Sequence, residues 1–226
     1  MSESSVPSAR QAFAKVGQRL PSRHGLSREE VAASQRARLL IGFLEVTAEK
    51  GYAAVTIGDI VERAGTSREA FYRQFAGKQE CFLAAFREGA EVALSQVSAP
   101  LEEVPYTEWR TGLRVSMRAY LALMAAYPAA TWTFMIEGLA AGPEVAALYG
   151  RRSERIAELY RLTYHRVVRR EDPSRPELPD DTFDILVGGM ADRVRHCLYT
   201  LGAEAIPELE PVFLTTILAL FGEKLD

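Results

Sequence analysis

The sequence predicts an all-α protein with about nine helices. Through most of the chain, apolar residues recur three and four positions apart, the spacing that places them on one face of a helix. Glycine and proline separate these segments, and three of them begin with a Ser or Thr three residues before an acidic residue. No stretch alternates apolar and polar residues over the length of a strand, and no repeat of solenoid period is present.

The first predicted helix begins at Ser27 and closes at Gly51. Ser27 and Glu30 have the spacing of a capping box, in which two side chains bond the free N–H groups of a starting helix. Gly51 stands where a helix commonly ends in the left-handed conformation. The apolar face of this helix is expected to contain Leu39, Leu40, Phe43, Leu44, Thr47 and Ala48.

A second, short helix is predicted after Thr56. Thr56 and Asp59 form the next capping-box pattern, and the helix runs to Ala64. Gly65 follows, where a tight turn requires a residue that can adopt a positive φ.

A third helix is predicted directly after that turn. Thr66 and Glu69 form its capping-box pattern, and it runs through Phe71, Tyr72 and Phe75. The two Phe side chains lie four positions apart and are expected in the core. Two short helices joined by a glycine turn are typical of a helix-turn-helix motif.

Six longer helices are predicted from residue 78 onward. Proline and glycine mark the breaks between them, because proline cannot continue a helix and glycine weakens one. The predicted ranges are 78–97, 106–126, 129–140, 143–170, 180–201 and 207–225.

Composition excludes several classes of protein. The chain has 226 residues, of which 48% are hydrophobic and 25% are charged, as in globular proteins. Two cysteines, Cys81 and Cys197, stand in no metal-ligand spacing and indicate neither a disulfide scaffold nor a zinc site. Residues 1–7 lack the pattern of a secretory signal, and the apolar run of residues 212–221 is too short to span a bilayer. We therefore expect a cytoplasmic protein.

The formal charge of −3 is unevenly distributed. Residues 1–87 contain 13 Lys and Arg against 9 Asp and Glu, a net charge of +4, and the remainder carries −7. This asymmetry favours a small module that binds a polyanion, attached to a body with another role. Residues 1–26 are expected to form a flexible basic arm, which is either a solvated tail or a segment that follows phosphates or enters a minor groove. The arm contains Arg10, Lys15, Arg19, Arg23 and His24 against Glu3.

Residues 28–86 resemble the DNA-binding domain of the TetR family of transcriptional regulators. Many residues match that domain at fixed spacing: Gly51, Tyr52, Val55, Thr56, Ile60, Ala64, Gly65, Phe71, Tyr72, Phe75, Gly77 and Lys78. The resemblance implies three domains or segments: the arm at 1–26, a helix-turn-helix DNA-binding domain at 27–77, and a helical domain at 78–226 that binds an effector and dimerises.

The resemblance also implies how the first domain would contact DNA. The third helix would enter the major groove with its first residues near base edges, and Thr56 and Lys78 would approach phosphates at the starts of neighbouring helices. Both threonines could instead act only as helix caps. The expected DNA-binding residues are Thr56, Thr66, Ser67, Arg68, Tyr72, Arg73 and Lys78.

Two positions depart from the family pattern. Glu69 replaces a small residue, and either completes a capping box or recognises a cytosine amino group. Gln74 replaces a common histidine. These departures concern which operator is read.

The resemblance implies a homodimer formed by the last two long helices, 180–201 and 207–225. The final helix is apolar around much of its circumference, so it must be buried on more than one side, by the partner subunit or within one chain. Gly188 and Gly189 would permit a close helix approach.

A pocket for a small apolar or aromatic ligand is expected in the body. Aromatic and Met side chains at helical spacing are more often plain core when taken singly, but as a cluster they suit such a pocket. Arg193, His196 and Glu137 could recognise charge or form surface ion pairs. The candidates are Met117, Tyr120, Met124, Trp132, Met135, Tyr160 and Tyr164, with Arg193 and His196.

The function implied is a dimeric repressor of transcription that a ligand releases from its operator. A DNA-binding regulator without a small-molecule effector is the alternative, and an all-α enzyme is a third. The chain contains no GxSxG, HExxH, P-loop or GxGxxG motif, and its three histidines are scattered. We expect no enzymatic activity, no cofactor, no metal and no membrane partner.

Overall fold

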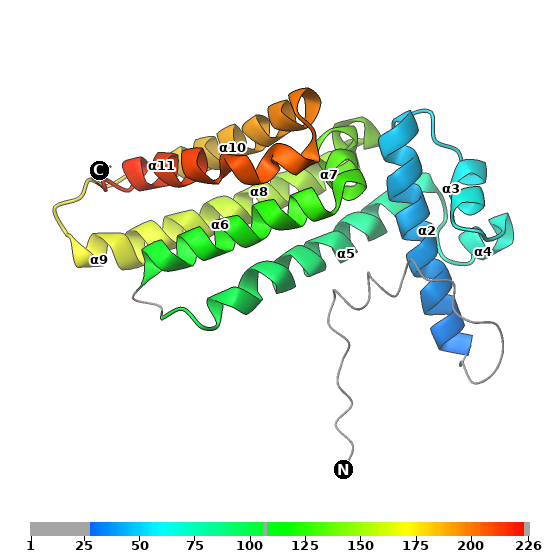
Figure 1. Cartoon of the computed structure of the whole chain (residues 1–226), viewed down its shortest axis with the longest axis horizontal. Coiled ribbons are helices and arrows are strands. Elements are labelled where there is room, and N and C mark those ends of the chain that lie inside the picture. The colour runs from blue at the N-terminus through cyan, green and yellow to red at the C-terminus, as the bar shows by residue number, and fades with distance from the viewer. Residues whose placement is uncertain (1–27, 106–107, 224–226) are drawn as a thin grey trace, which may run out of the picture. The chain divides into compact units, whose positions relative to one another are not determined.

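The computed structural model describes residues 28–105 and 108–223, and that part of the chain is entirely helical (Figure 1). It contains nine helices when α8 and the turns that continue it are counted as one, which confirms the predicted fold class. None of the described helices is long and apolar enough to cross a membrane. The arm and the cap at Ser27 lie outside the described residues.

The chain divides into two compact units, the first ending at Ser95 and the second beginning at Gln96. Our predicted boundary after residue 77 assigns the helix α5 (Lys78–Ser98) to the second domain, whereas its contacts place most of it in the first unit. The reason is its buried face. Phe82 packs edge to face against Phe43 at 5.7 Å and Tyr52 at 5.8 Å between ring centroids.

In the first unit, α2 (Arg28–Lys50) packs against the short helices α3 (Ile57–Arg63) and α4 (Arg68–Tyr72), and α5 also packs on α2. Phe71 and Phe75 are buried, as predicted. The backbones of α2 and α3 approach closely at Gly42, where a Cβ atom would lie 3.1 Å from the Ile60 carbonyl oxygen. The core of this unit is therefore formed by apolar faces that the periodicity of the sequence identifies.

The predicted turn glycines and the predicted cap of α3 are confirmed, whereas both predicted ends of α4 differ from the structure. Gly51 and Gly65 adopt positive φ angles of 78° and 60°. Thr56 caps α3 through both hydrogen bonds of the predicted box with Asp59. The third box is wrong, because Ser67 rather than Thr66 caps α4.

The shift of this cap by one residue follows from the preceding turn. Thr66 donates its backbone N–H to the Val61 carbonyl at 2.9 Å and so still belongs to the end of α3. Ser67 Oγ accepts the N–H of Ala70 at 3.1 Å. The helix α4 then ends at Tyr72, three residues before the predicted limit at Phe75.

The second unit is a helical bundle in which α10 packs on α8 and α11 packs on α6 (Figure 1). Pro128 and Pro143 occupy first-turn positions of α7 and α8, as expected where proline starts a helix. The long helices are α6 (Trp109–Ala126), α7 (Pro128–Met135), α8 (Pro143–Thr163), α10 (Asp181–Thr200) and α11 (Glu210–Leu220).

Three predicted ranges in this unit differ from the structure. The 129–140 helix ends at Met135 and continues as the 3-10 turn η2 (Glu137–Ala141). The 143–170 helix contains a π-helical turn, η3 (Tyr164–Val168), before α9 (Arg169–Glu171). The last helix starts at Glu210 rather than residue 207, because Pro207 lies inside the 3-10 turn η4 (Ala203–Leu209). Another 3-10 turn, η1 (Ala99–Leu101), follows α5.

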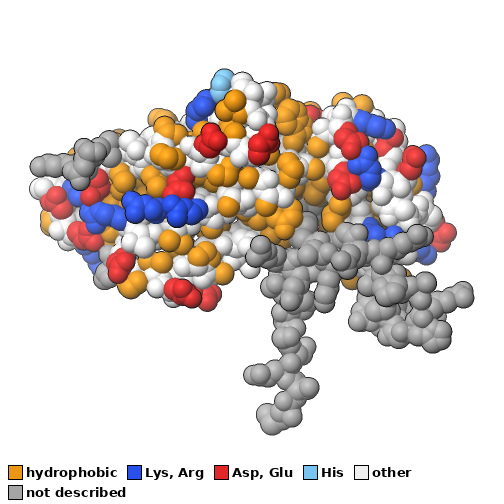
Figure 2. All heavy atoms as spheres, in the orientation of Figure 1, with side chains coloured by type: hydrophobic (Ala, Val, Ile, Leu, Met, Phe, Trp, Pro, Cys, Tyr) orange, Lys and Arg blue, Asp and Glu red, His pale blue; other side chains and the backbone are white. Residues whose placement is uncertain are grey.

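Arginines along α6 hold α11 at both of its ends. Figure 2 shows a row of basic side chains over α6. Arg118 forms an ion pair with Glu210, the first residue of α11, at 2.8 Å, and Arg110 forms one with Glu223, beyond its last residue, at 2.7 Å.

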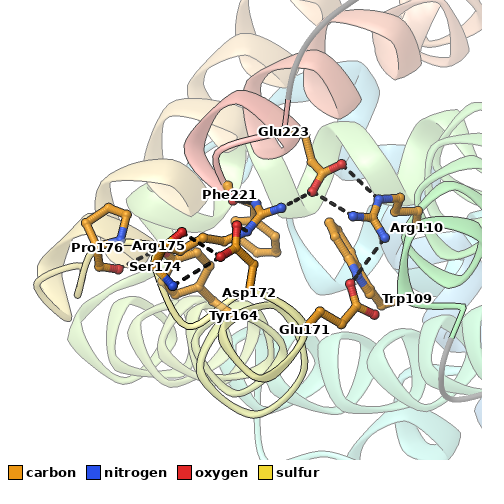
Figure 3. A network of polar contacts seen from close by, with 10 residues as sticks. All are labelled: Trp109, Arg110, Tyr164, Glu171, Asp172, Ser174, Arg175, Pro176, Phe221 and Glu223. Atoms are coloured by element: carbon orange, nitrogen blue, oxygen red, sulfur yellow. Dashed lines mark hydrogen bonds and ion pairs between the residues drawn. The ribbon is translucent and has the colours of Figure 1, made fainter.

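A polar network closes the end of the bundle where α6 begins and α11 ends (Figure 3). Arg175 donates to the Phe221 carbonyl and to Glu223, and its side chain is only 13% exposed. The indole of Trp109 donates to Glu171 at 3.1 Å. Arg175 thus joins the loop before α10 to the end of α11, and Trp109 joins the start of α6 to α9.

Replacing Arg175 with alanine should lower the free energy of unfolding by about 2–3 kcal/mol, because the buried Phe221 carbonyl loses its side-chain donor and Glu223 loses one of its two arginine partners. Urea unfolding followed by circular dichroism measures this loss. Arg114→Ala is the matched control: this exposed arginine on α6 forms no ion pair with any described residue and should change stability by less than about 0.5 kcal/mol. Equal stabilities of the two variants would contradict the structural role of Arg175.

The same network predicts how stability depends on acid. The hydrogen bond from Arg110, with that from Arg175, lowers the pKa of Glu223 below its usual value despite burial. A carboxylate whose folded pKa is lowered stabilises the fold above its unfolded pKa, about 4.3, and this stabilisation disappears as the pH falls. Between about pH 5 and 3, wild-type stability should therefore fall more steeply than that of Arg175→Ala. Parallel pH profiles would contradict this.

Candidate DNA-binding site

The helix α4 presents a polar face to solvent and an apolar face to the core. Ser67, Arg68, Tyr72 and Arg73 are exposed, whereas Ala70 and Phe71 between them are buried. Tyr72 is 58% exposed, a high value for a large aromatic side chain. The buried side chains thus hold α4 against the core of the first unit, and its exposed side chains are accessible to a ligand.

Arg68 lies beside the start of α3. A Cβ atom added to Gly58 would lie 3.2 Å from Arg68 Nη2 and 3.3 Å from Thr56 Oγ1. The structure therefore brings Thr56, Gly58 and Arg68 together at the N-terminal end of α3. Free backbone N–H groups and the helix dipole favour an anion at such an end.

Gly58 is a residue that the sequence analysis missed. Its importance depends on the close approach of Arg68 from the following helix, and no spacing in the sequence reveals that approach. Because glycine is unfavourable within a helix, its presence in α3 is a weak signal that another group approaches the backbone there.

Most other cations of the first unit have acidic partners. Arg63 pairs with Glu45 and Glu49 at 3.1 and 2.6 Å, and Lys50 pairs with Asp59 at 2.6 Å. In α3 and α4, Arg68 is the arginine that forms no such pair with a described residue. Its guanidinium is therefore the most available cation on these two helices.

Glu69 does not complete a capping box, so the first of its two expected roles, as a capping residue rather than a reader of cytosine, is wrong. Its carboxylate pairs with Arg73 at 3.3 Å, one turn further along, and both side chains are more than half exposed. An ion pair so exposed stabilises little. Arg73 can therefore exchange this partner for a phosphate at small cost.

Lys78 has a structural role that the sequence analysis did not foresee. Its ammonium group donates to the carbonyls of Tyr52 and Val55 at 2.6 and 2.9 Å and lies 4.4 Å from the Tyr52 ring centroid. Burial lowers its pKa. Lys78 thus holds the loop between α2 and α3, and its predicted contact with phosphate would compete with these bonds.

The turn between α3 and α4 is held by a second residue that the sequence analysis missed. Arg38 donates to the carbonyl of Ala64 at 3.2 Å and approaches that of Gly65 at 3.4 Å. It satisfies carbonyls at the end of α3, where a helix has no partners of its own. Thr66, half-buried in this turn, is less accessible than Ser67 and Arg68.

Comparison with known proteins identifies this arrangement. A sequence model described as "Bacterial regulatory proteins, tetR family" matches residues 44–85, from the middle of α2 into α5. This segment is a TetR-family DNA-binding domain. The HTH-type transcriptional activator FasR of Mycolicibacterium smegmatis is 33% identical over 86 residues, so the match spans 38% of this chain and 38% of FasR.

Solved structures show that the TetR-type fold extends over most of the chain. The fatty acid degradation regulator FadR from Bacillus halodurans has a TM-score of 0.66 at 12% identity, covering 90% of this chain and 100% of FadR. A TetR-family regulator from Streptomyces coelicolor has a TM-score of 0.61 at 19% identity, covering 88% and 98%. FadR from Bacillus subtilis, in complex with stearoyl-CoA, has a TM-score of 0.61 at 12% identity, covering 80% and 96%.

Beyond the TetR-family domain, the structure sorts the predicted pocket residues into three groups. Met117, Met124, Met135 and Tyr164 are buried in the core of the second unit, and Tyr120, Trp132 and Tyr160 are partly buried and packed against it. Arg193 and His196 are exposed on α10, away from this core. Arg193 and His196, which were predicted to recognise a charged ligand group, are therefore not part of the buried cluster.

Tyr164 is best explained by packing. It is fully buried, its hydroxyl donates to the Pro176 carbonyl at 2.8 Å, and its ring lies 5.2 Å from that of Phe221. All of its surface is used by the bundle.

The helices predicted to form the dimer expose apolar side chains, although α10 also exposes charged ones, among them Asp184, Asp192 and Arg193. On α10, Ile185 and Tyr199 are 74% and 64% exposed, and Gly188 and Gly189 lie between them on the helix. On α11, the exposed residues are Pro211, Val212, Thr215, Thr216 and Ala219. A helix face of this composition favours burial against a partner.

Proposed function

We propose that the protein is a dimeric transcriptional regulator of the bacterial cytoplasm that binds an operator and is released from it by a small ligand. The observation that supports DNA binding is the exposed face of α4, where Arg68 pairs with no carboxylate of the described residues and lies beside the N-terminal end of α3. Arg68 and Ser67 would reach base edges, and Tyr72, Arg73 and Thr56 would contact phosphates.

A dimer would match the two-fold symmetry of an operator. Its two α4 helices would enter successive major grooves, about 34–36 Å apart. Selection of bound DNA from random sequence at stated salt concentration tests this proposal. We expect an inverted repeat with half-sites about one helical turn apart, and recovery of no preferred sequence would overturn the proposal.

The exposed apolar side chains of α10 and the uncharged exposed residues of α11 support dimerisation through these helices. Ile185→Glu should raise the dimer dissociation constant at least roughly 100-fold, because each dimer would bury two unpaired carboxylates. Sedimentation velocity measures the change. Leu94→Glu alters a similarly exposed apolar side chain of α5 and should leave the dimer intact. Dimers of unchanged affinity in Ile185→Glu would place the interface elsewhere.

The partly buried aromatic side chains of the second unit support an apolar ligand. The stearoyl-CoA complex of the similar FadR from Bacillus subtilis favours an acyl compound as the first class to test. Thermal-shift screening followed by DNA-release measurement tests this part. A compound that stabilises the protein and releases DNA would establish ligand control, and stabilisation without release would contradict it.

The direction of regulation needs its own measurement, because the similar FasR is described as an activator. We expect repression. A reporter gene fused to the selected operator should be expressed more strongly when the protein is absent, and the opposite result would make the protein an activator.

A further inference from the structure

An arginine inside the second unit lacks an acidic partner. Arg152 of α8 is half-buried, and its guanidinium donates to the hydroxyl of Tyr120 on α6 and lies 5.8 Å from the centroid of that ring. No carboxylate of residues 28–105 or 108–223 lies within 4.0 Å of it. Arg161, nine residues further along the same helix, by contrast pairs with Glu158 and with Asp180.

Two tyrosines from different helices lie close to this charge, and a third, Tyr160, lies close to Tyr120. Tyr149 donates its hydroxyl to the Phe134 carbonyl of α7 and is close enough to Arg152 for the positive charge to oppose the rise in pKa that burial causes. Burial also raises the pKa of Tyr160, and Tyr120 adds to that rise. Arg152 therefore lies beside the phenols of Tyr120 and Tyr149.

Space for Tyr149 is provided by a glycine. A Cβ atom at Gly138 would collide with the Tyr149 phenol, so the close packing of η2 on α8 requires glycine there. The position of the Tyr149 side chain thus depends on glycine at residue 138.

A half-buried guanidinium without a counterion is costly in an apolar environment. It has five N–H donors in a planar arrangement that suits the two oxygens of a carboxylate or phosphate, and one neutral hydroxyl satisfies few of them. Around it, Tyr120 and Tyr160 pack against a core that includes Met117 and Met124. A cationic group beside an apolar, aromatic wall fits a ligand with an oxyanion head and an apolar body.

We infer that Arg152, with Tyr120, Tyr149 and Tyr160, forms a binding site for the carboxylate or phosphate group of an amphiphilic ligand. The inference rests on the proposed control by ligand and names the class of that ligand. It also replaces Arg193 and His196 as the source of charge recognition, since both are exposed on another helix.

The test compares three probes on the full-length protein: decanoate, decyl phosphate and uncharged decanol, each below its micelle concentration. We expect calorimetry to show at least tenfold tighter binding of one or both anions than of decanol. Which anion binds more tightly identifies the head group. Equal affinities for all three probes, or binding of none, would overturn the inference.

Variants locate the site. Arg152→Gln should lose at least tenfold in affinity for the preferred anion, with little change for decanol, and Arg152→Lys should retain part of the preference. Arg155→Gln removes an exposed arginine from the same helix and should bind as the wild type does. Circular dichroism checks that Arg152→Gln is folded. Retention of full anion affinity by folded Arg152→Gln would overturn the inference.

A separate measurement distinguishes this site from the proposed function. DNA binding is measured with and without the preferred anion for the wild type and Arg152→Gln. If the anion releases the wild-type protein from DNA but does not release Arg152→Gln, both proposals are supported. Anion binding that depends on Arg152 but leaves DNA binding unchanged would support the site and contradict its control of transcription.

Discussion

Replacing Arg68 with alanine should weaken operator binding by roughly 30- to 1,000-fold, which corresponds to about 2–4 kcal/mol per dimer. Each dimer loses two guanidinium groups, and a guanidinium paired with a base edge contributes about 1–3 kcal/mol of discrimination. Arg68 is free of carboxylates among the residues described, so nothing in the folded protein competes with DNA for it. Fluorescence anisotropy with the selected operator, at fixed salt, measures the loss.

Arg87→Ala is the matched control for this substitution. Arg87 is also an exposed arginine of the first unit without an ion pair to any described residue, but it lies on α5 rather than on α4. Its loss should change affinity less than about threefold. Two further results would support sequence reading by Arg68: relaxed preference at one base pair of each half-site, and an unfolding curve equal to that of the wild type. Equal effects of both substitutions would indicate a general electrostatic contribution instead.

Removing the charges of the arm should have the second large effect. Residues 1–27 contain four Lys and Arg against one acidic residue, whereas residues 28–87 contain nine against eight. Most of the net charge of the basic third therefore belongs to its first 27 residues. Replacing Arg10, Lys15, Arg19 and Arg23 with glutamine should lower affinity by roughly 100-fold or more near 100 mM salt, because a dimer could release counterions from up to eight phosphates.

The salt dependence identifies the cause of this loss. The slope of log affinity against log salt concentration should become shallower by several units, up to about seven if all eight contacts form. A matched control replaces four exposed arginines of the second unit, Arg114, Arg151, Arg155 and Arg170, with glutamine. It removes the same net charge, so an equal change of slope would show that overall charge matters rather than the arm. An unchanged slope in the arm variant would identify residues 1–26 as a tail without a role in DNA binding.

Local sequence patterns predicted the secondary structure well where the causes are local. The capping box at Thr56, the left-handed glycines Gly51 and Gly65 and the proline starts of α7 and α8 all depend on neighbours within four residues. Such interactions can be read from spacing alone. The cap of α4 was misplaced because two adjacent residues, Thr66 and Ser67, can both act as caps, and a tertiary turn selected the second.

The sequence by itself determined the helical class, the TetR-type helix-turn-helix and the exposed face that Arg68 shares with Tyr72 and Arg73. Periodicity places apolar residues on one face of a helix, so the remaining residues must face solvent or a partner.

Only the tertiary structure decided which charged groups are available. Lys78 is held by carbonyls 23 to 26 residues away, and Arg68 lies against Gly58 of another helix. Arg152 is directed to Tyr120 across 32 residues, whereas Arg193 and His196 remain outside. Long side chains reach whichever partners the packing of helices brings within a few ångströms, and that distance is set by the fold rather than by spacing along the chain.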